Sequence, residues 1–248
     1  MVTSMALAIA LWPIQVTHYC PPLSDTLIVG VAFNDQKEFL YCELFSQISD
    51  KKFHSDYVRE SNTFATKDLD FSNSLFLPDV TQLDFRSGEL REATINNQQV
   101  NLKYREEKNK KDEQANLARN QVDALDAGFN DFIRAHWDEL ITGNTLTINF
   151  GSIAHQKTLP LRISQRSSEK CGNILNKEYS TAPFCFMIEI DNMFLRLLVG
   201  NIKLTYDKQH RLQEFNGTVN IQNNKQKSQN AIIHYYYNND YLPAPNIK

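Results

Sequence analysis

A set of four charged residues stands out on the predicted N-terminal part of the sheet. Glu43 lies on an otherwise aromatic face of a predicted strand, and Asp84 and Arg86, two residues apart, share one strand face. Lys67 completes the set on the predicted N-terminal part of the sheet. Such residues either form buried ion pairs that only stabilise the fold, or bind the polar head group of a ligand.

A second pair, Asp126 and His136, lies on the apolar side of a predicted helix. A carboxylate and an imidazole in such a place must find partners, because burying an unpaired polar group costs free energy. Ten residues of helix separate the two by about 15 Å, so they cannot bond to each other. Both are candidates for contacts with a ligand inside a barrel, and the alternative is that they only tie the helix to the sheet backbone.

No known catalytic motif accompanies these candidates. The sequence contains no GxSxG, HExxH, Walker A or GxGxxG motif, and its six histidines show no metal-ligand spacing. We therefore predict no catalytic residue, no metal and no cofactor. Glycine is scarce, at 8 of 248 residues, whereas asparagine occurs 24 times. Asparagine can supply the hairpin turns, but few glycines remain for the phosphate-binding loops of nucleotide enzymes.

The four cysteines, Cys20, Cys42, Cys171 and Cys185, show neither CxxC nor zinc-ligand spacing. If the protein is exported, pairing between sequence neighbours is the simplest arrangement, which gives Cys20–Cys42 and Cys171–Cys185. The sequence leaves open the alternative that all four are buried free thiols.

The net charge bears on the kind of partner, and the N-terminus bears on the location of the protein. A formal charge of −3 argues against a nucleic-acid partner, which would select a basic surface. Residues 5–16 are apolar except at Pro13 and Gln15, a run shorter than the ~20 residues of a membrane span. We expect residues 1–22 to be a signal sequence or an apolar N-terminal segment, without a transmembrane span. The expected location is therefore periplasmic or otherwise exported, with the cytoplasm as the alternative.

Apolar and polar residues alternate over most of the chain, which is typical of strands with one buried face. The clearest segments are 27–33, 39–45, 145–150, 159–163, 184–190, 202–206 and 232–237. Strands of this kind predict an antiparallel sheet that covers a core on one side.

Residues 112–141 follow a helical period instead. The apolar positions of this period are Ala115, Ala118, Val122, Leu125, Phe129, Phe132, Ile133, His136 and Leu140. The predicted fold is mainly β (α+β): a large curved antiparallel sheet or incomplete β-barrel, with one long helix over about 112–141 packed in its concave face. We expect a single domain over residues 23–237 and a loosely ordered tail over 238–248.

One stretch of sequence resembles a family of uncharacterised bacterial proteins. It covers Asp126 to Arg134 and continues with Trp137, Leu140 and Gly143. Further matches lie at 65–67, 70–71, 78, 84–88, 206–207, 212, 217 and 220–221, so that the resemblance spans roughly 25–237. Members typically carry an N-terminal signal sequence, so the resemblance implies export. It implies no activity and no catalytic residue.

These observations predict a non-enzymatic cell-envelope protein that binds an apolar or amphiphilic molecule, such as a lipid, between helix and sheet. The candidate ligand-binding residues are Glu43, Lys67, Asp84, Arg86, Asp126 and His136. The 27 aromatic side chains are enough either to line a cavity or simply to fill the core. One alternative is a structural or assembly factor that acts through its surface, and a second is a hydrolase of unrecognised type.

Overall fold

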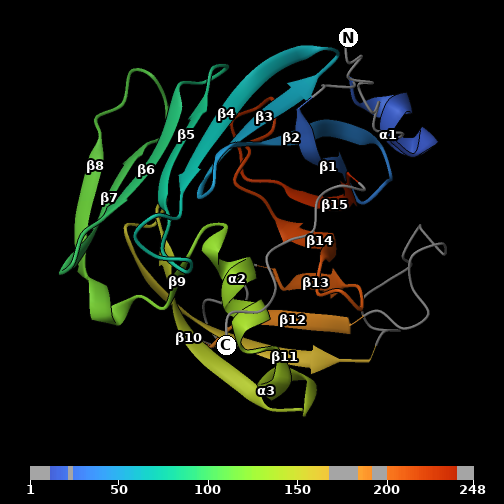
Figure 1. Cartoon of the computed structure of the whole chain (residues 1–248). Helices are drawn as coiled ribbons and strands as arrows, with labels where there is room; N and C mark the ends of the chain where they lie inside the picture. The colour runs from blue at the N-terminus through green and yellow to red at the C-terminus, as the bar shows by residue number, and fades with distance from the viewer. Residues whose placement is uncertain (1–11, 22–24, 168–183, 192–199, 239–248) are drawn as a thin grey trace, which may run out of the picture.

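One curved sheet of 15 strands dominates the protein (Figure 1). The computed structural model describes residues 12–21, 25–167, 184–191 and 200–238. The first eight strands are β1 (Thr26–Phe33), β2 (Phe39–Ser49), β3 (Lys52–Arg59), β4 (Asn62–Asp70), β5 (Asp79–Asp84), β6 (Glu89–Ile95), β7 (Gln99–Arg105) and β8 (Glu113–Ala118). The other seven are β9 (Ala124–Leu125), β10 (Thr145–Ser152), β11 (Lys157–Arg166), β12 (Phe184–Ile190), β13 (Ile202–Tyr206), β14 (Leu212–Thr218) and β15 (Asn230–Tyr237).

The sheet is a chain of antiparallel neighbours that is open at both ends. Its order runs from β8 back to β1, then from β15 back to β9. The pairing of β1 with β15 joins the two halves. Among the described strands, only the short β9 pairs parallel, with β10. The prediction of a mainly β fold with one large curved sheet is confirmed.

The predicted helix over 112–141 is wrong in its first half. That half contains β8, a 3-10 turn at Arg119–Gln121 and β9, and only α2 (Gly128–Ala135) and α3 (Trp137–Ile141) are helical. Strand β8 pairs with β7 along its whole length, so its backbone hydrogen bonds go to the sheet. Asp126 has a φ of +44°, a left-handed conformation that a continuous right-handed helix cannot contain.

Helices α2 and α3 lie inside the curve of the sheet, where the helix was predicted (Figure 1). Their buried residues are Phe132, Ile133, Trp137 and Leu140, and they pack on Ile148, Leu161, Ile163, Phe186, Ile188, Ile190, Leu204 and Tyr206 of β10–β13. Gly128 lets α2 begin here, because a Cβ at this position would collide with the backbone carbonyl of Phe76.

The short helix α1 (Ile14–Tyr19) lies on the outer face of the sheet, opposite to α2 (Figure 1). Val16 and Cys20 are buried there against Val29 and Leu44 of β1 and β2. A disulfide joins Cys20 to Cys42 and fixes this segment to β2. Buried free thiols are therefore the wrong alternative for this pair. Cys185 is also disulfide-bonded, and Cys171, its predicted partner, lies outside the described residues.

Removing the Cys20–Cys42 disulfide should lower the free energy of unfolding by about 3 kcal/mol, because the bridge restricts the unfolded chain over a separation of 22 residues. Urea denaturation of oxidised wild type and of the Cys20→Ser/Cys42→Ser double variant measures the difference. The double variant is preferable to a reductant, which would also open the bridge at Cys185. A loss below ~1 kcal/mol would show that the disulfide adds little to stability.

Candidate binding sites

A cluster of buried polar side chains lines the inner face of β2–β6. Two rows follow from the strand register: Ser55, Lys67, Gln82 and Arg91 in one, and Glu43, Tyr57, Ala65, Asp84 and Glu89 in the other. Side chains that face each other on neighbouring strands lie about 5 Å apart. The two rows are therefore adjacent on the same face of the sheet. We call the polar members of these rows, together with Asp126, the interior polar cluster.

Lys67 and Asp126 form a buried ion pair at the centre of this cluster. The Lys67 Nζ lies 2.8 Å from Asp126 Oδ1, and the two side chains are only 9% and 6% exposed. Asp126 also accepts hydrogen bonds from Asn220 Nδ2 and from the backbone N–H of Ala127. The carboxylate therefore ties the start of α2 to β4 and to the loop after β14.

Two further carboxylates in the cluster each have an arginine of their own. Arg86 Nη2 lies 2.5 Å from Asp84 Oδ2, and Arg91 Nη2 lies 2.7 Å from Glu89 Oε1. Both arginines also reach the loop between β14 and β15: Arg86 donates to the carbonyl of Gln222, and Arg91 donates to the side-chain oxygen of Asn220. These pairs thus connect the N-terminal half of the sheet to its C-terminal half.

Glu43 differs from these carboxylates, because no ion pair joins it to a cation among the described residues. Its Oε2 accepts a hydrogen bond of 3.1 Å from the Tyr235 hydroxyl. Burial raises the pKa of Glu43 to about 7, although the positive charge of Lys67 acts in the opposite direction. Glu43 is therefore the carboxylate of this cluster whose charge is least balanced.

Several polar atoms of the interior have no hydrogen-bond partner. They are Tyr41 Oη, Ser55 Oγ, Gln82 Oε1 and Glu89 Oε2, and each belongs to a residue that is at most 2% exposed. Buried polar atoms are normally paired, so these four atoms are exceptions among the described residues.

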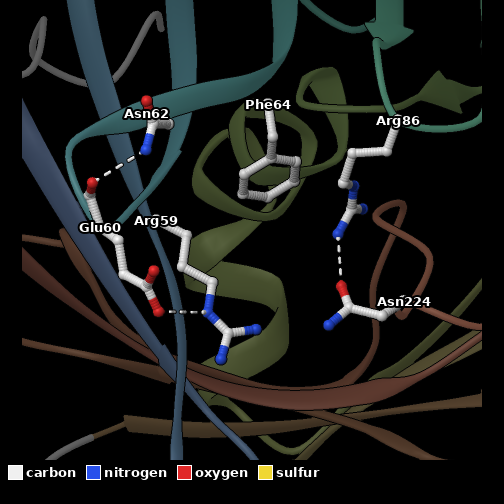
Figure 2. A pocket seen from close by; sticks show the side chains of 6 residues that line it. All are labelled: Arg59, Glu60, Asn62, Phe64, Arg86 and Asn224. Atoms are coloured by element: carbon white, nitrogen blue, oxygen red, sulfur yellow. Dashed lines mark hydrogen bonds and ion pairs between the residues drawn. The ribbon is translucent and has the colours of Figure 1, made fainter.

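An open depression of about 360 Å³ lies at the surface beside the turn from β3 to β4. Its lining is Arg59, Glu60, Asn62, Phe64, Arg86 and Asn224 (Figure 2). The guanidinium of Arg86 lies 4.1 Å from the centre of the Phe64 ring and donates to Asn224. We call this hollow the Phe64 depression. Arg86 links it to the interior polar cluster through its bond to Asp84.

The fold brings five of the six predicted site residues close to one another, and the sixth, His136, lies elsewhere. Glu43, Lys67, Asp84 and Asp126 all belong to the interior polar cluster, and Arg86 lies between the cluster and the Phe64 depression. Glu43 and Arg86 form no ion pair with each other, and Arg86 binds Asp84 instead.

His136 lies apart from this cluster, at the C-terminal end of α2. Its Nδ1 is 2.9 Å from the carbonyl oxygen of Phe132, and its ring stacks on the Phe132 ring at 4.1 Å. Asp126 precedes α2, so the prediction that Asp126 and His136 share one helix is wrong. The His136 ring also lies 6.3 Å from the ring of Phe76, so the contacts of His136 are those of a structural residue.

Four polar residues of this region were missed in the sequence: Gln82, Glu89, Arg91 and Asn220. Glu89 and Arg91 have the same spacing as Asp84 and Arg86, and that repeat was a usable signal. Gln82 precedes Asp84 by two residues, so it shares its strand face. Asn220 lies in a loop, where no periodicity marks a residue that turns inward.

A serine and a histidine lie in hydrogen-bond contact at the turn between β10 and β11. Ser152 Oγ is 2.8 Å from His155 Nδ1. Burial and nearby cations lower the pKa of His155, so the imidazole is neutral at pH 7. However, Ser152 is only 8% exposed, and in the part of the chain that the structure describes no third group orients the imidazole. The pair lacks the arrangement that a hydrolase needs.

The described residues lack two other kinds of site. None of their helices has the length and apolar character to cross a membrane. No group of three or more histidine, cysteine, aspartate or glutamate side chains within the described ranges has a geometry that could hold a metal ion.

Comparison with known proteins gives a resemblance in structure. No family model and no curated protein matches this chain. A crystal structure from Brucella abortus, described as a beta-barrel-like protein of a domain of unknown function, DUF1849, is similar to it with a TM-score of 0.44. The two are 6% identical, and the match covers 86% of this chain and 98% of that chain. That protein's description names no ligand or activity.

Proposed function

We propose that this protein is a non-enzymatic protein of the cell envelope that binds an amphiphilic molecule with an anionic group in the Phe64 depression. The observation that carries the proposal is an open hollow of about 360 Å³ in which an aromatic ring lies among two arginines, two asparagines and one glutamate. Apolar carbon of a ligand can pack on Phe64, while a phosphate or carboxylate receives hydrogen bonds from the guanidinium and amide groups.

Arg59 is the residue best placed to receive the anionic group. Its side chain is 44% exposed, and its one ion pair with a described residue, Glu60, is long at 3.9 Å. Arg86 is already held by Asp84, the carbonyl of Gln222 and Asn224, so it shapes the depression and has little freedom to rearrange. A ligand therefore gains more from Arg59 than from Arg86.

The place of binding differs from the predicted one between helix and sheet. Among the described residues, the side chains of α2 and α3 fill that interface as a core with β10–β13. A ligand there would have to displace packed apolar side chains. The Phe64 depression requires no such displacement.

Disulfide bonding supports the proposed location. Cys20 is bonded to Cys42, and Cys185 is also disulfide-bonded. Structural disulfides form and persist in oxidising compartments and are rare in a reducing cytosol. A periplasmic or otherwise exported protein fits this chemistry better than a cytoplasmic protein does.

Calorimetric titration with dodecyl phosphate below its critical micelle concentration tests the binding. Arg59→Gln should weaken binding by about tenfold, the loss expected for one charge-assisted hydrogen bond at an exposed site. Lys110→Gln removes the same charge from an exposed position outside the depression and should leave binding unchanged. Equal binding of dodecyltrimethylammonium, or equal affinities of wild type and Arg59→Gln, would refute the proposal.

A further inference from the structure

Strand β8 leaves one of its two edges without a partner. It is the last strand at one end of the sheet (Figure 1), and its residues, Glu113–Ala118, all pair with β7. Strand β11 comes near β8, but no backbone hydrogen bond joins β8 to any described segment except β7. The N–H and C=O groups that point away from β7 can therefore pair with a further strand.

The sequence of β8 contains nothing that prevents such pairing. Edge strands of soluble proteins commonly carry a lysine, a proline or a bulge that keeps other strands away. Strand β8 contains no lysine and no proline, and its register with β7 is unbroken. Gln114, Asn116 and Ala118 are exposed, and Ala115 and Leu117 are partly exposed. The edge is thus regular and accessible over the length of an ordinary strand.

The two ends of this edge carry opposite charges. Glu113 begins the strand, and Arg119 follows its last residue. The N–H of Arg119 still donates to the carbonyl of Gln98 beside β7, so Arg119 continues the line of the strand. Neither Glu113 nor Arg119 forms an ion pair with a described residue, whereas Asp112, next to Glu113, is bound by Lys103. Both charges are therefore available to a partner strand.

A second copy of β8 matches this pattern when the two strands run antiparallel about Asn116. Glu113 then lies opposite the partner's Arg119, and the two-fold axis repeats this pair at the other end. Ala115 lies opposite the partner's Leu117, so that two partly exposed apolar side chains cover each other. The two Asn116 side chains meet at the axis, where their amides can bond to each other.

Other registers of the same two strands match less well. An axis one residue earlier would place Arg119 opposite the partner's Lys111, which is a pair of like charges. An axis half a residue earlier would place Leu117 opposite the partner's Gln114 and lose the apolar contact. An axis after Asn116 within β8 would place Arg119 opposite uncharged residues. The charges and the apolar pair together select the register centred on Asn116.

We propose that β8 is an interface for a second copy of this chain, which joins the two sheets antiparallel across a two-fold axis at Asn116. No residue that lines the Phe64 depression belongs to β8, and the interface does not depend on the proposed function. One strand of six residues on each side gives an interface below the standard size. We therefore expect a reversible dimer with a Kd on the order of 10–100 µM.

Sedimentation velocity of the full chain between about 5 and 500 µM tests the dimer, because the sedimentation coefficient should rise with concentration. Asn116→Lys puts two ammonium groups at the axis, and Glu113→Arg sets two arginines against each other, so each should raise the Kd at least tenfold. Glu113→Arg/Arg119→Glu restores opposite charges and should bring the Kd to within about threefold of wild type. As a control, Gln36→Lys adds a charge at the exposed turn between β1 and β2 and should leave the Kd unchanged.

Cysteine cross-linking tests the register of the two strands. None of the described cysteines is free, so an introduced cysteine supplies the reactive thiol. Two Asn116→Cys chains would bring their Cα atoms to about 5 Å across the axis, within the range of a disulfide. Gln114→Cys lies on the same face, but its two copies would be about 14 Å apart. Mild oxidation followed by non-reducing electrophoresis should link most of the Asn116→Cys chains and few of the Gln114→Cys chains.

Three results would each overturn the proposal. The first is a sedimentation coefficient that stays constant up to 500 µM, as expected if β8 binds a strand of another protein or no strand at all. The second is an equal Kd for Asn116→Lys and Gln36→Lys, which would place the contact between copies elsewhere. The third is equal cross-linking of Asn116→Cys and Gln114→Cys, which would exclude this register.

Discussion

Lys67→Met should lower the free energy of unfolding by about 3–5 kcal/mol, as expected when one partner of a buried ion pair is removed. The variant leaves Asp126, which is 6% exposed on its side chain, without its cation. Asp126 also has a left-handed backbone, so its carboxylate helps to fix an unfavourable conformation at the start of α2. Urea denaturation monitored by circular dichroism measures the loss.

Two variants show whether the loss comes from the unpaired charge. In Lys67→Met/Asp126→Asn no charge remains at this site, and asparagine tolerates the left-handed backbone, so at least half of the lost stability should return. Lys103→Met breaks an ion pair with Glu92 whose side chains are about one-third exposed, and it should cost less than ~1 kcal/mol. A similar loss in Lys103→Met and Lys67→Met would contradict the buried role of Lys67.

The strands were predictable because alternation fixes which side chains meet. The predicted segments 145–150 and 159–163 lie within β10 and β11, where Leu146 pairs with Ile163 and Ile148 with Leu161. Each pair lies on the face that packs against α2 and α3. A shift of one residue would turn all of these side chains to the other face, so the pattern determines the register as well as the strand.

The helix prediction failed in a segment whose apolar residues fit both the helical period and the strand period. Ala115 and Ala118 fit a helix, but Ala115 and Leu117 also alternate with polar Gln114 and Asn116 as in a strand. Pairing with β7 decides between the two, and such a contact between separate segments leaves no trace in the local period. An edge strand buries little, so its apolar signal is weak.

The sequence identified several residues of the candidate site, but it did not show which of them contact each other. Lys67 and Asp126 were recognisable as charged residues in apolar surroundings, yet 59 residues separate them in the sequence. Asn220, which also binds Asp126, lies 94 residues further along, in the loop between β14 and β15. That loop reaches the interior of the sheet through contacts between the N-terminal and C-terminal halves of the sheet. Local sequence patterns carry no information on such contacts, so they could not predict the position of Asn220.

Trp137→Ala should lower the free energy of unfolding by about 3–5 kcal/mol, the usual cost of removing a large buried aromatic side chain. Trp137 is 3% exposed. Its ring packs edge-on against Phe186 and Tyr206 at 5.2 and 5.5 Å and stacks on His210 at 3.8 Å. These neighbours come from β12, from β13 and from the turn after β13. Removing the Trp137 side chain would therefore remove the contacts that hold α3 to that part of the sheet.

Phe129→Ala is the matched comparison for Trp137→Ala. Phe129 is half-buried on α2 and contacts Phe150 at 5.7 Å, so its loss should cost about 1–2 kcal/mol. A continuous helix over 112–141 would bury Phe129 at its centre and give the two variants similar effects. The broken helix instead predicts a loss at least twice as large for Trp137, measured by urea denaturation in parallel, and the reverse order would contradict this packing of α2 and α3.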